Sequence, residues 1–348
     1  MNPEPLLEVR DLNTHFLTDE GVVKAVDGLS FSIPKGKTLC VVGESGCGKS
    51  VTARSILQLI DPPGKLISGD ILFHSAPGQT LNLADLSPRG KAIRRVRGGE
   101  IAMIFQEPMS SLSPVHTIGN QIIEAILLHL TKDRKEAKLR AIEALRRVGI
   151  PKPEERLGAY TFELSGGMRQ RAMIAMALAC EPKLLIADEP TTALDVTTQA
   201  NILDLIRTLQ EDSDMAVMFI THDLGVVAEI ADEVVVMYLG QIAERGDVDS
   251  IFHDPKHPYT RALLASIPKL GVREHSRLES IRGMVPHPSN RPSGCPFHTR
   301  CDAFVPGTCD ELVPPTEQLA AGRDVRCLLY SDLKQVRSAQ AQRGAAPS

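Results

Sequence analysis

One glycine-rich segment has residue types and a spacing that suit phosphate binding. GESGCGKS spans residues 43–50, between the apolar run 39–42 and a stretch compatible with a helix. Backbone N–H groups at the positive end of such a helix form a concave site for phosphate oxygens. Lys49 would add positive charge on the outer phosphates, and Ser50 would offer its hydroxyl to Mg²⁺. The residues predicted to contact a di- or triphosphate here are Gly43, Ser45, Gly46, Cys47, Gly48, Lys49, Ser50 and Val51.

Four apolar runs indicate the sheet that must position this segment. They cover residues 39–42, 101–105, 184–187 and 216–220, and each ends in a polar or glycine-rich element. Helical stretches separate them, which is typical of an α/β fold with a mainly parallel sheet. In such sheets ligands bind beyond the carboxyl ends of the strands, so we expect the residues that follow the runs to meet at one site.

The polar residues at these strand ends predict hydrolytic chemistry. Two adjacent carboxylates, Asp188 and Glu189, end one run, and like charges at low dielectric disfavour joint ionisation unless a cation is present. We expect Asp188, Ser50 and Gln106 to bind the Mg²⁺ of a nucleotide. Glu189 would then orient and deprotonate the attacking water, and His222 would donate a hydrogen bond to the γ-phosphate.

A second predicted anion-binding helix start lies at LSGGMRQR, residues 164–171. Ser165 is a good N-cap, and Gly166 and Gly167 leave the backbone N–H groups uncovered. Because the chain already has one phosphate site, we expect this one to meet nucleotide held by another subunit.

Two flanking regions differ from the α/β core. Residues 6–34 alternate apolar stretches with turn signals, which predicts a hairpin in an antiparallel β subdomain. There, Phe16 either stacks on a base or packs as a strand aromatic in the core. Residues 107–163 carry helical periodicity without strand signals and are interpreted as a helical insertion.

Taken together, the motifs carry a family resemblance. GESGCGKS, FQEP, LSGGMRQ, LLIADE, ALD at 193–195 and THD at 221–223 occur in the order and spacing of an ABC-transporter ATPase subunit. The resemblance covers about residues 6–270 and implies a RecA-like core that hydrolyses ATP. It also implies a head-to-tail pair of subunits, with each ATP between the phosphate loop of one and the LSGGMRQ signature of the other. Phe16 resembles the adenine-stacking aromatic of the family, whereas Val51 stands where many members have Thr or Ser.

From residue 253 onward, HDPKHPYTRALLASIP resembles the subfamily that serves dipeptide, oligopeptide and nickel importers. We therefore expect an ATPase domain at 1–270, an extension at 271–330 and a disordered tail at 331–348. The extension holds Cys295, Cys301, Cys309 and Cys327. Four thiols in a short, core-poor segment favour a ligand set over disulfides. The resemblance implies a [4Fe–4S] cluster, while zinc and unligated thiols remain alternatives.

Composition narrows the function classes. The formal net charge is −4, which disfavours a nucleic-acid binder, and no apolar run is long enough to span a membrane. The N-terminal residues lack the apolar core of a secretory signal. Together with these features, the resemblance implies a peripheral protein on the cytoplasmic side of the plasma membrane that hydrolyses ATP to drive peptide import. The resemblance implies as partners a second, paralogous ATPase, two transmembrane permease subunits and an extracytoplasmic solute-binding protein. The alternatives are an importer ATPase for nickel or another small solute, a soluble ABC ATPase acting on nucleic acid, and a regulatory subunit that does not hydrolyse ATP.

Overall fold

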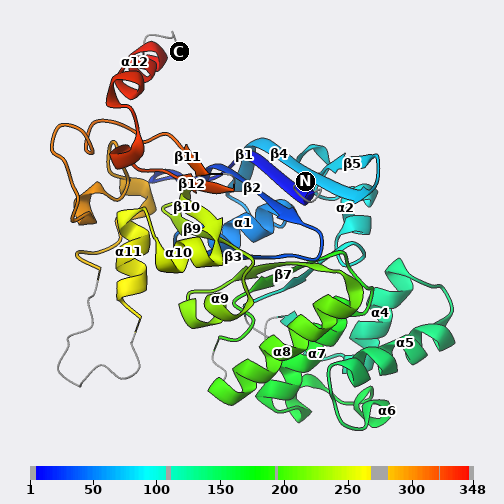
Figure 1. Cartoon of the computed structure of the whole chain (residues 1–348). Helices are drawn as coiled ribbons and strands as arrows, with labels where there is room; N and C mark the ends of the chain where they lie inside the picture. Colours follow the sequence, from blue (N-terminus) through cyan, green and yellow to red (C-terminus); the bar gives the residue numbers. More distant parts are fainter. Residues whose placement is uncertain (1–4, 107–110, 193–194, 268–280, 321, 345–348) are drawn as a thin grey trace, which may run out of the picture.

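The computed structural model describes residues 5–106, 111–192, 195–267, 281–320 and 322–344. Two sheets lie above a group of helices, and a C-terminal extension lies at one end (Figure 1). The strands are β1 (Pro5–Thr18), β2 (Gly21–Pro34), β3 (Thr38–Val42), β4 (Gly64–Ala76), β5 (Gln79–Asn82), β6 (Ile101–Ile104), β7 (Leu184–Asp188), β8 (Ala216–Ile220), β9 (Glu233–Tyr238), β10 (Gln241–Asp247), β11 (Glu317–Ala320) and β12 (Arg323–Val325). The α-helices are α1 (Lys49–Ile56), α2 (Lys91–Val96), α4 (Ile118–His129), α5 (Arg134–Arg147), α6 (Pro153–Arg156), α7 (Gly166–Leu178), α8 (Val196–Ser213), α9 (Leu224–Ile230), α10 (Val248–His253), α11 (Pro258–Ala265) and α12 (Leu333–Gly344).

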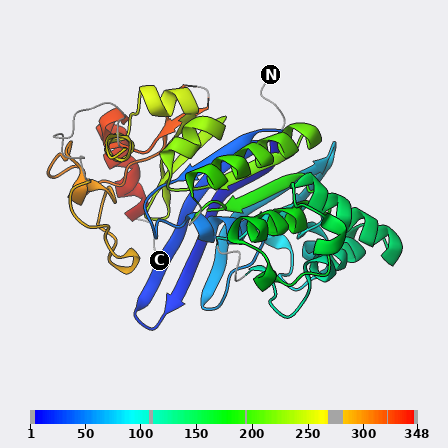
Figure 2. The same cartoon turned by 90° about the horizontal axis from the view of Figure 1, so that it is seen from below.

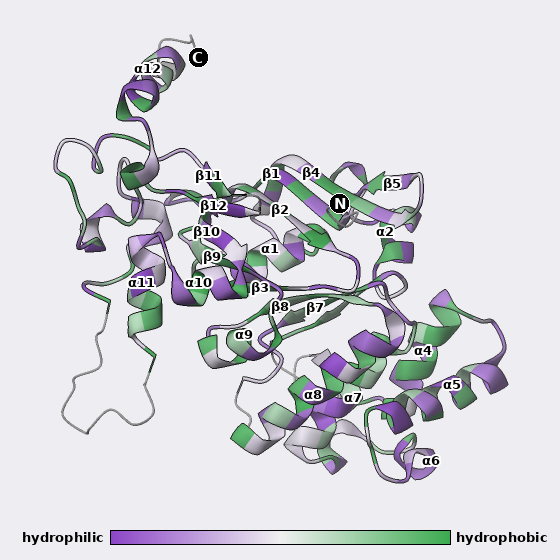
Figure 3. Ribbon diagram, viewed as in Figure 1, coloured by the Kyte–Doolittle hydropathy of each residue, from purple (hydrophilic) through white to green (hydrophobic). Residues whose placement is uncertain are grey.

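The larger sheet has the strand order β11-β12-β10-β9-β3-β8-β7-β6. Its central strands run parallel: β3 pairs with β8 and β9, and β7 pairs with β6 and β8. Strand β3 is buried on both faces: Cys40 and Val42 belong to the core on the helical side, whereas Leu39 and Val41 belong to the core beneath the second sheet. The predicted α/β fold with a mainly parallel centre is confirmed, and the apolar central strands are visible in Figure 3.

The second sheet is antiparallel, in the order β2-β1-β4-β5, as the sequence of the N-terminal region predicts. The expected hairpin turns between Thr18 and Gly21. In the segment LISGDILFH a glycine separates two apolar stretches, a pattern that predicts two strands around a turn; the structure shows that this prediction is wrong. Gly69 lies inside the single strand β4, at φ +101°, where the pairing with β1 shifts register. A Cβ at Gly69 would lie 2.5 Å from the Asp11 carbonyl oxygen, so the glycine accommodates a bulge rather than a turn.

The predicted helical insertion forms α4, α5 and α6. Thr117 caps α4 and Asp133 caps α5, each accepting a backbone N–H with its side chain. The buried residues of α4 recur at Ile118, Ile122 and Ile126, the spacing of one helix face. In Figure 2 the insertion lies at one end of the molecule and the C-terminal extension at the other.

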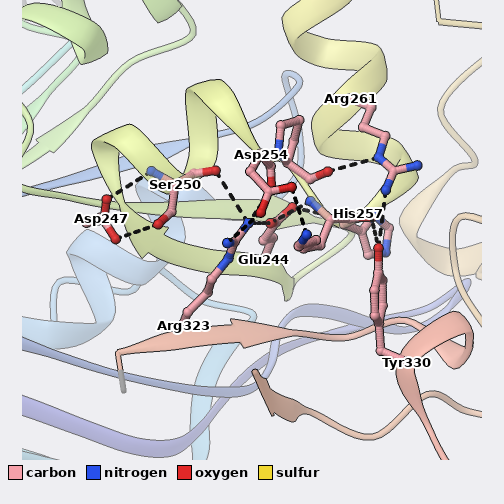
Figure 4. A network of polar contacts seen from close by, with 10 residues as sticks. Glu244, Asp247, Ser250, Asp254, His257, Arg261, Arg323 and Tyr330 are labelled. Carbon is pink, nitrogen blue, oxygen red and sulfur yellow. Dashed lines mark hydrogen bonds and ion pairs between the residues drawn. The ribbon is translucent and has the colours of Figure 1, made fainter. Parts of the chain in front are cut away.

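The C-terminal extension is continuous with the larger sheet. Strand β12 pairs with β10 through Glu244 with Val325 and Arg245 with Asp324, so the larger sheet includes strands from beyond residue 270. A polar network around Glu244 fixes this junction (Figure 4). The buried Glu244 carboxylate accepts the backbone N–H groups of Lys256 and His257 at 2.8 Å each, and Arg323 of β12 lies 3.7 Å from it.

The prediction of a disordered tail at 331–348 is wrong for the part that the structure describes. Residues 333–344 form α12, although the segment has little apolar content. Two features account for the helix: Val336 is buried in the main core cluster, and the Asp332 side chain accepts the Lys334 backbone N–H at 2.9 Å. Gln340 also bonds the backbone of Val313 and Glu311, which fastens the helix to the extension.

Within the described ranges, no helix combines the length and the apolar content that crossing a bilayer requires.

Candidate functional site

The glycine-rich segment turns tightly between β3 and α1 because side chains at two of its positions would collide with backbone. Gly43 has φ +150° and Gly48 has φ +100°. A Cβ at Gly43 would lie 2.3 Å from the Met237 carbonyl oxygen, and one at Gly48 would lie 2.1 Å from that of Ala25. Lys49 is 5% exposed, and its Nζ donates to the carbonyl oxygens of Gly43 (2.8 Å) and Glu44 (3.1 Å). Lys49 thereby joins the end of the glycine-rich segment to its beginning by hydrogen bonds.

Ser50 and Asp188 form the oxygen-rich edge of the site. The Ser50 hydroxyl donates to Asp188 Oδ1 at 3.0 Å, and Asp188 is 2% exposed. Burial raises the pKa of Asp188; the Ser50 hydrogen bond opposes this rise, and the charge of Glu189 adds to it. A hydroxyl and a carboxylate are hard oxygen donors of the kind that Mg²⁺ prefers, so these residues fit the ion.

Glu189 is the residue on which the polar side chains converge. Its carboxylate accepts hydrogen bonds from Gln106 Nε2 and Thr192 Oγ1, both at 3.1 Å, and lies 3.3 Å from His222 Nδ1. Its backbone has φ +47°, a conformation that costs energy in a non-glycine residue, and its N–H donates to the Ile220 carbonyl at 2.9 Å. The structure thus brings Gln106, Glu189 and His222 together from three strand ends. Thr192 was missed, although it follows Glu189 by three residues in the same turn.

A pocket of about 250 Å³ adjoins these groups. The predicted residues in its lining are Phe16, Ser45, Gly46, Gly48, Lys49, Ser50, Val51, Gln106 and Glu189. Phe16 is only partly buried, so the interpretation of this residue as a core aromatic is not supported. Gly43 and Cys47 belong to the loop but not to the lining; Cys47 is 1% exposed, and burial raises the pKa of its thiol.

Sequence reasoning missed the other lining residues. They are Val23, Lys24, Ala25, Leu239, Gly240, Pro288 and Arg291. Backbone of β2 and of the β9–β10 turn carries no motif, and Pro288 and Arg291 lie in an extension that was interpreted only through its cysteines. A signal was present in HPYT, which was read as a family marker without a role: the Tyr259 hydroxyl accepts the Glu44 backbone N–H at 2.9 Å.

The signature segment lies apart from this pocket. The Ser165 side chain accepts the Met168 backbone N–H and caps α7, as predicted. Ser165 and Gly166 are exposed, and no atom lies within 4 Å of a Cβ placed on Gly166. Nothing in the described chain therefore requires glycine at 166, and neither Ser165, Gly166 nor Gly167 lines the pocket. Of the ALD motif, Ala193 and Leu194 lie outside the described residues; Asp195 caps α8.

The four C-terminal cysteines gather in one region as free thiols. Cys295, Cys309 and Cys327 are buried, Cys301 is half-buried, and the Cys295 backbone N–H donates to the Cys309 carbonyl at 2.8 Å. Burial raises the pKa of Cys295 to about 12, and the charges of Cys327, Cys301 and Cys309 contribute to the rise. Among the residues described, no three His, Cys, Asp or Glu side chains are arranged to hold a single metal ion. This geometry therefore supports neither the iron–sulfur prediction nor the zinc alternative.

Comparison with known proteins agrees with this fold and site. Residues 26–192 match the family model described as ABC transporter, and residues 243–309 match the model described as oligopeptide/dipeptide transporter, C-terminal region. The chain is 53% identical to a probable peptide ABC transporter ATP-binding protein of Sinorhizobium fredii, covering 92% of this chain and 94% of that one. It is 47% identical to the dipeptide transport ATP-binding protein of Escherichia coli, covering 92% and 96% respectively.

Solved structures share the fold. A dimeric bacterial ABC transporter cassette superposes with a TM-score of 0.61 at 24% identity, covering 70% of this chain and 98% of that one. The structure of cbiO1 from Clostridium perfringens, part of the ABC transporter complex cbiONQ, gives a TM-score of 0.60 at 27% identity, covering 72% of this chain and 92% of that one. The parallel sheet, the glycine-rich loop and the strand-end carboxylates define a phosphate-loop ATPase. Within that class, the chain belongs to the ABC transporter family, as an ATP-binding subunit.

Proposed function

We propose that this chain hydrolyses ATP in the pocket around Lys49 to drive import of dipeptides or oligopeptides through separate membrane subunits. The observation that carries the catalytic part is the convergence of Gln106, Thr192 and His222 on the Glu189 carboxylate beside that pocket. The substrate class is supported by the C-terminal region match at residues 243–309 and by the peptide transporters among the relatives.

In this proposal each polar residue has one task. The loop N–H groups and Lys49 bind the phosphates, and Ser50 and Asp188 hold Mg²⁺, which neutralises charge on the phosphate oxygens when bound. Glu189 accepts a proton from the attacking water. Gln106 and Thr192 hydrogen-bond Oε2 of Glu189 and so fix the orientation of its carboxylate. His222 contacts Oε1 and is 63% exposed at its side chain, so it remains available to the γ-phosphate.

We propose further that the signature helix start completes the nucleotide site of a second, paralogous ATPase subunit. Its support is local: Ser165 and Gly166 are exposed, and no atom of the described chain lies within 4 Å of a Cβ placed on Gly166. The N-terminus of a 13-residue helix favours anionic ligands, which suits a triphosphate presented by a partner.

An exposed apolar patch, formed by Val115, Tyr160 and Phe162, is proposed as a contact with the membrane subunits. Val115 is 74% and Phe162 66% exposed, and Tyr160 stacks on Phe162 with ring centroids 5.5 Å apart. A bridge between Thr117 and Tyr160 holds the two segments together. Phe162→Asp should release the chain from membranes that contain the permease, while the control Leu319→Asp, on β11 at the far end, should not. Equal retention of both variants would remove this assignment.

For the four-cysteine site we propose an iron–sulfur cluster. The donor set suits it: four free thiols in a segment with little core of its own. Anaerobically purified protein should contain iron and acid-labile sulfide, and Cys301→Ser should lose both. Zinc without iron, or no metal at all, would overturn the assignment.

The importer proposal is tested by transport. The complete complex, reconstituted in vesicles with its solute-binding protein, should show ATP-dependent uptake of a labelled dipeptide. Uptake of a nickel chelate but not of peptides would replace the substrate class and leave the ATPase intact. ATP turnover stimulated by nucleic acid, without membrane association, would favour the soluble alternative. A peripheral location on the cytoplasmic side of the membrane is also part of the proposal, since it follows from the transport role.

A further inference from the structure

The C-terminal extension contributes two residues to the nucleotide pocket. Pro288 and Arg291 line the same pocket as Phe16 and Lys49, although they follow Lys49 by more than 200 residues. The short helical turn Pro288–Asn290 packs against β2, the strand that supplies Lys24 and Ala25 to the lining. The pocket is therefore enclosed partly by a segment outside the ABC transporter match at residues 26–192.

Arg291 is fixed in place by a carboxylate on the pocket wall. Its Nη1 donates to Asp27 Oδ2 at 2.6 Å, and Gln241 Nε2 donates to the same oxygen at 2.8 Å. Burial alone would raise the pKa of Asp27, but the charge of Arg291, the Gln241 hydrogen bond and the charge of Lys24 together lower it. The carboxylate is thus held ionised, and it orients the guanidinium.

One donor of this guanidinium remains unused. Arg291 Nη2 is buried and has no hydrogen-bond partner among the residues that the structure describes, and the side chain as a whole is 20% exposed. A buried N–H group without a partner is costly, and a guanidinium presents its donors as a fork that matches phosphate oxygens. Because Nη2 is closed to solvent in the nucleotide-free chain, a ligand oxygen in the pocket would satisfy the missing bond once the guanidinium turns toward it.

A second anchor sets the position of the segment. Arg300 donates to both carboxylate oxygens of Glu44, at 2.6 and 2.9 Å, and its guanidinium lies over the rings of Tyr238 and Phe297. Since Glu44 belongs to the phosphate loop, the extension is fastened to that loop as well as to β2. Arg291 consequently keeps a defined place relative to the loop.

We propose that Arg291 is a nucleotide-binding residue that donates from Nη2 to the ribose–phosphate part of ATP, between the base side of the pocket at Phe16 and the phosphate loop. This rests on the nucleotide site proposed above. Because ATP and ADP share the ribose and the inner phosphates, Arg291 contributes equally to the binding of both. A residue that contacts the γ-phosphate would instead distinguish the two nucleotides.

The test is calorimetric titration of the full-length protein with ADP and with a non-hydrolysable ATP analogue, in Mg²⁺. Arg291→Ala should raise both dissociation constants by about tenfold or more and by the same factor. Arg291→Lys keeps a charge next to Asp27 but loses the fork; it should retain the melting temperature of the nucleotide-free protein and still bind both nucleotides more weakly. The matched control is Arg282→Ala, an 82% exposed arginine of the same extension, which should bind as the parent protein does.

Lys49→Ala distinguishes a failure of the Arg291 inference from a failure of the proposed nucleotide site. If the parent protein binds nucleotide, Lys49→Ala abolishes binding, and Arg291→Ala and Arg291→Lys both bind normally, the inference about Arg291 is wrong and the site stands. If Lys49→Ala binds as the parent protein does, the proposed site itself is wrong. Weakened binding of the ATP analogue alone by Arg291→Ala would also overturn the inference.

Discussion

Arg300 of the cysteine-bearing extension and Glu44 of the phosphate loop form a two-pronged ion pair, with nitrogen–oxygen distances of 2.6 and 2.9 Å. The Arg300 side chain is 3% exposed and that of Glu44 is 23% exposed. The hydrogen bonds from Arg300 to Glu44 raise the pKa of Arg300 above its ordinary value, so the charge is permanent. Because Arg300 immediately precedes Cys301, this ion pair connects the glycine-rich loop to the segment that carries the cysteines.

This pair should contribute to both stability and nucleotide affinity. Arg300→Ala leaves a carboxylate beside the phosphates without its partner, and we expect a loss of about 2–3 kcal/mol in the free energy of unfolding together with weaker ATP binding. A double-mutant cycle with Glu44→Ala, read by chemical denaturation, should give a coupling energy of about 1–3 kcal/mol. Strictly additive effects would show that the contact is energetically silent.

The buried imidazole of His257 predicts a pH dependence of stability. Burial lowers the pKa of His257 to about 4, and Nδ1 accepts the Tyr259 backbone N–H at 3.0 Å. Between about pH 6.5 and pH 4 the unfolded chain therefore binds a proton at this imidazole that the folded chain does not bind. The contribution of neutral His257 to the free energy of unfolding is fully present above about pH 6.5 and falls by at most about 3 kcal/mol as the pH falls toward 4.

Denaturation at pH 7.5 and pH 5 measures this effect. His257→Asn retains an acceptor for the Tyr259 N–H but does not titrate, so its stability should change less between the two pH values than that of the parent protein. His253→Asn, at an exposed position at the end of α10, should show the same change in the free energy of unfolding between the two pH values as the parent protein. An identical slope in all three proteins would rule out His257 as the source.

The role of the signature segment predicts a defect that appears only in the assembled complex. Ser165→Asp keeps the N-cap of α7 but places a negative charge where a partner's triphosphate would lie. ATP turnover by the complex should fall severely, whereas ATP binding by the isolated chain should stay unchanged, since Ser165 does not line its own pocket. Ser165→Thr, which keeps the hydroxyl, is the control. Normal turnover by the Asp variant would contradict the shared site.

The sequence predicts those parts of the site that depend on local spacing. Gly43 and Gly48 can be identified because a tight turn before a helix needs glycine, and Gln106, Asp188 and His222 because each ends an apolar run. Contacts between segments distant in sequence carry no such signal. Arg291 and Arg300 reach the pocket and the loop only through the fold of the extension. The sequence around Gly69 predicts a turn because a bulge can be recognised only when the partner strand β1 is known. The helix at 333–344 depends on burial of Val336, which composition does not reveal.

The proposed function requires that the Lys49 pocket bind ATP and that Glu189 activate the attacking water. Both requirements are tested by measuring ATP affinity and phosphate release on the same preparation of the complex carrying Glu189→Gln. We predict parent-like affinity with phosphate release slowed by about 100-fold or more, because the amide cannot accept the proton. Phosphate release at the parent rate would show that Glu189 is not the general base.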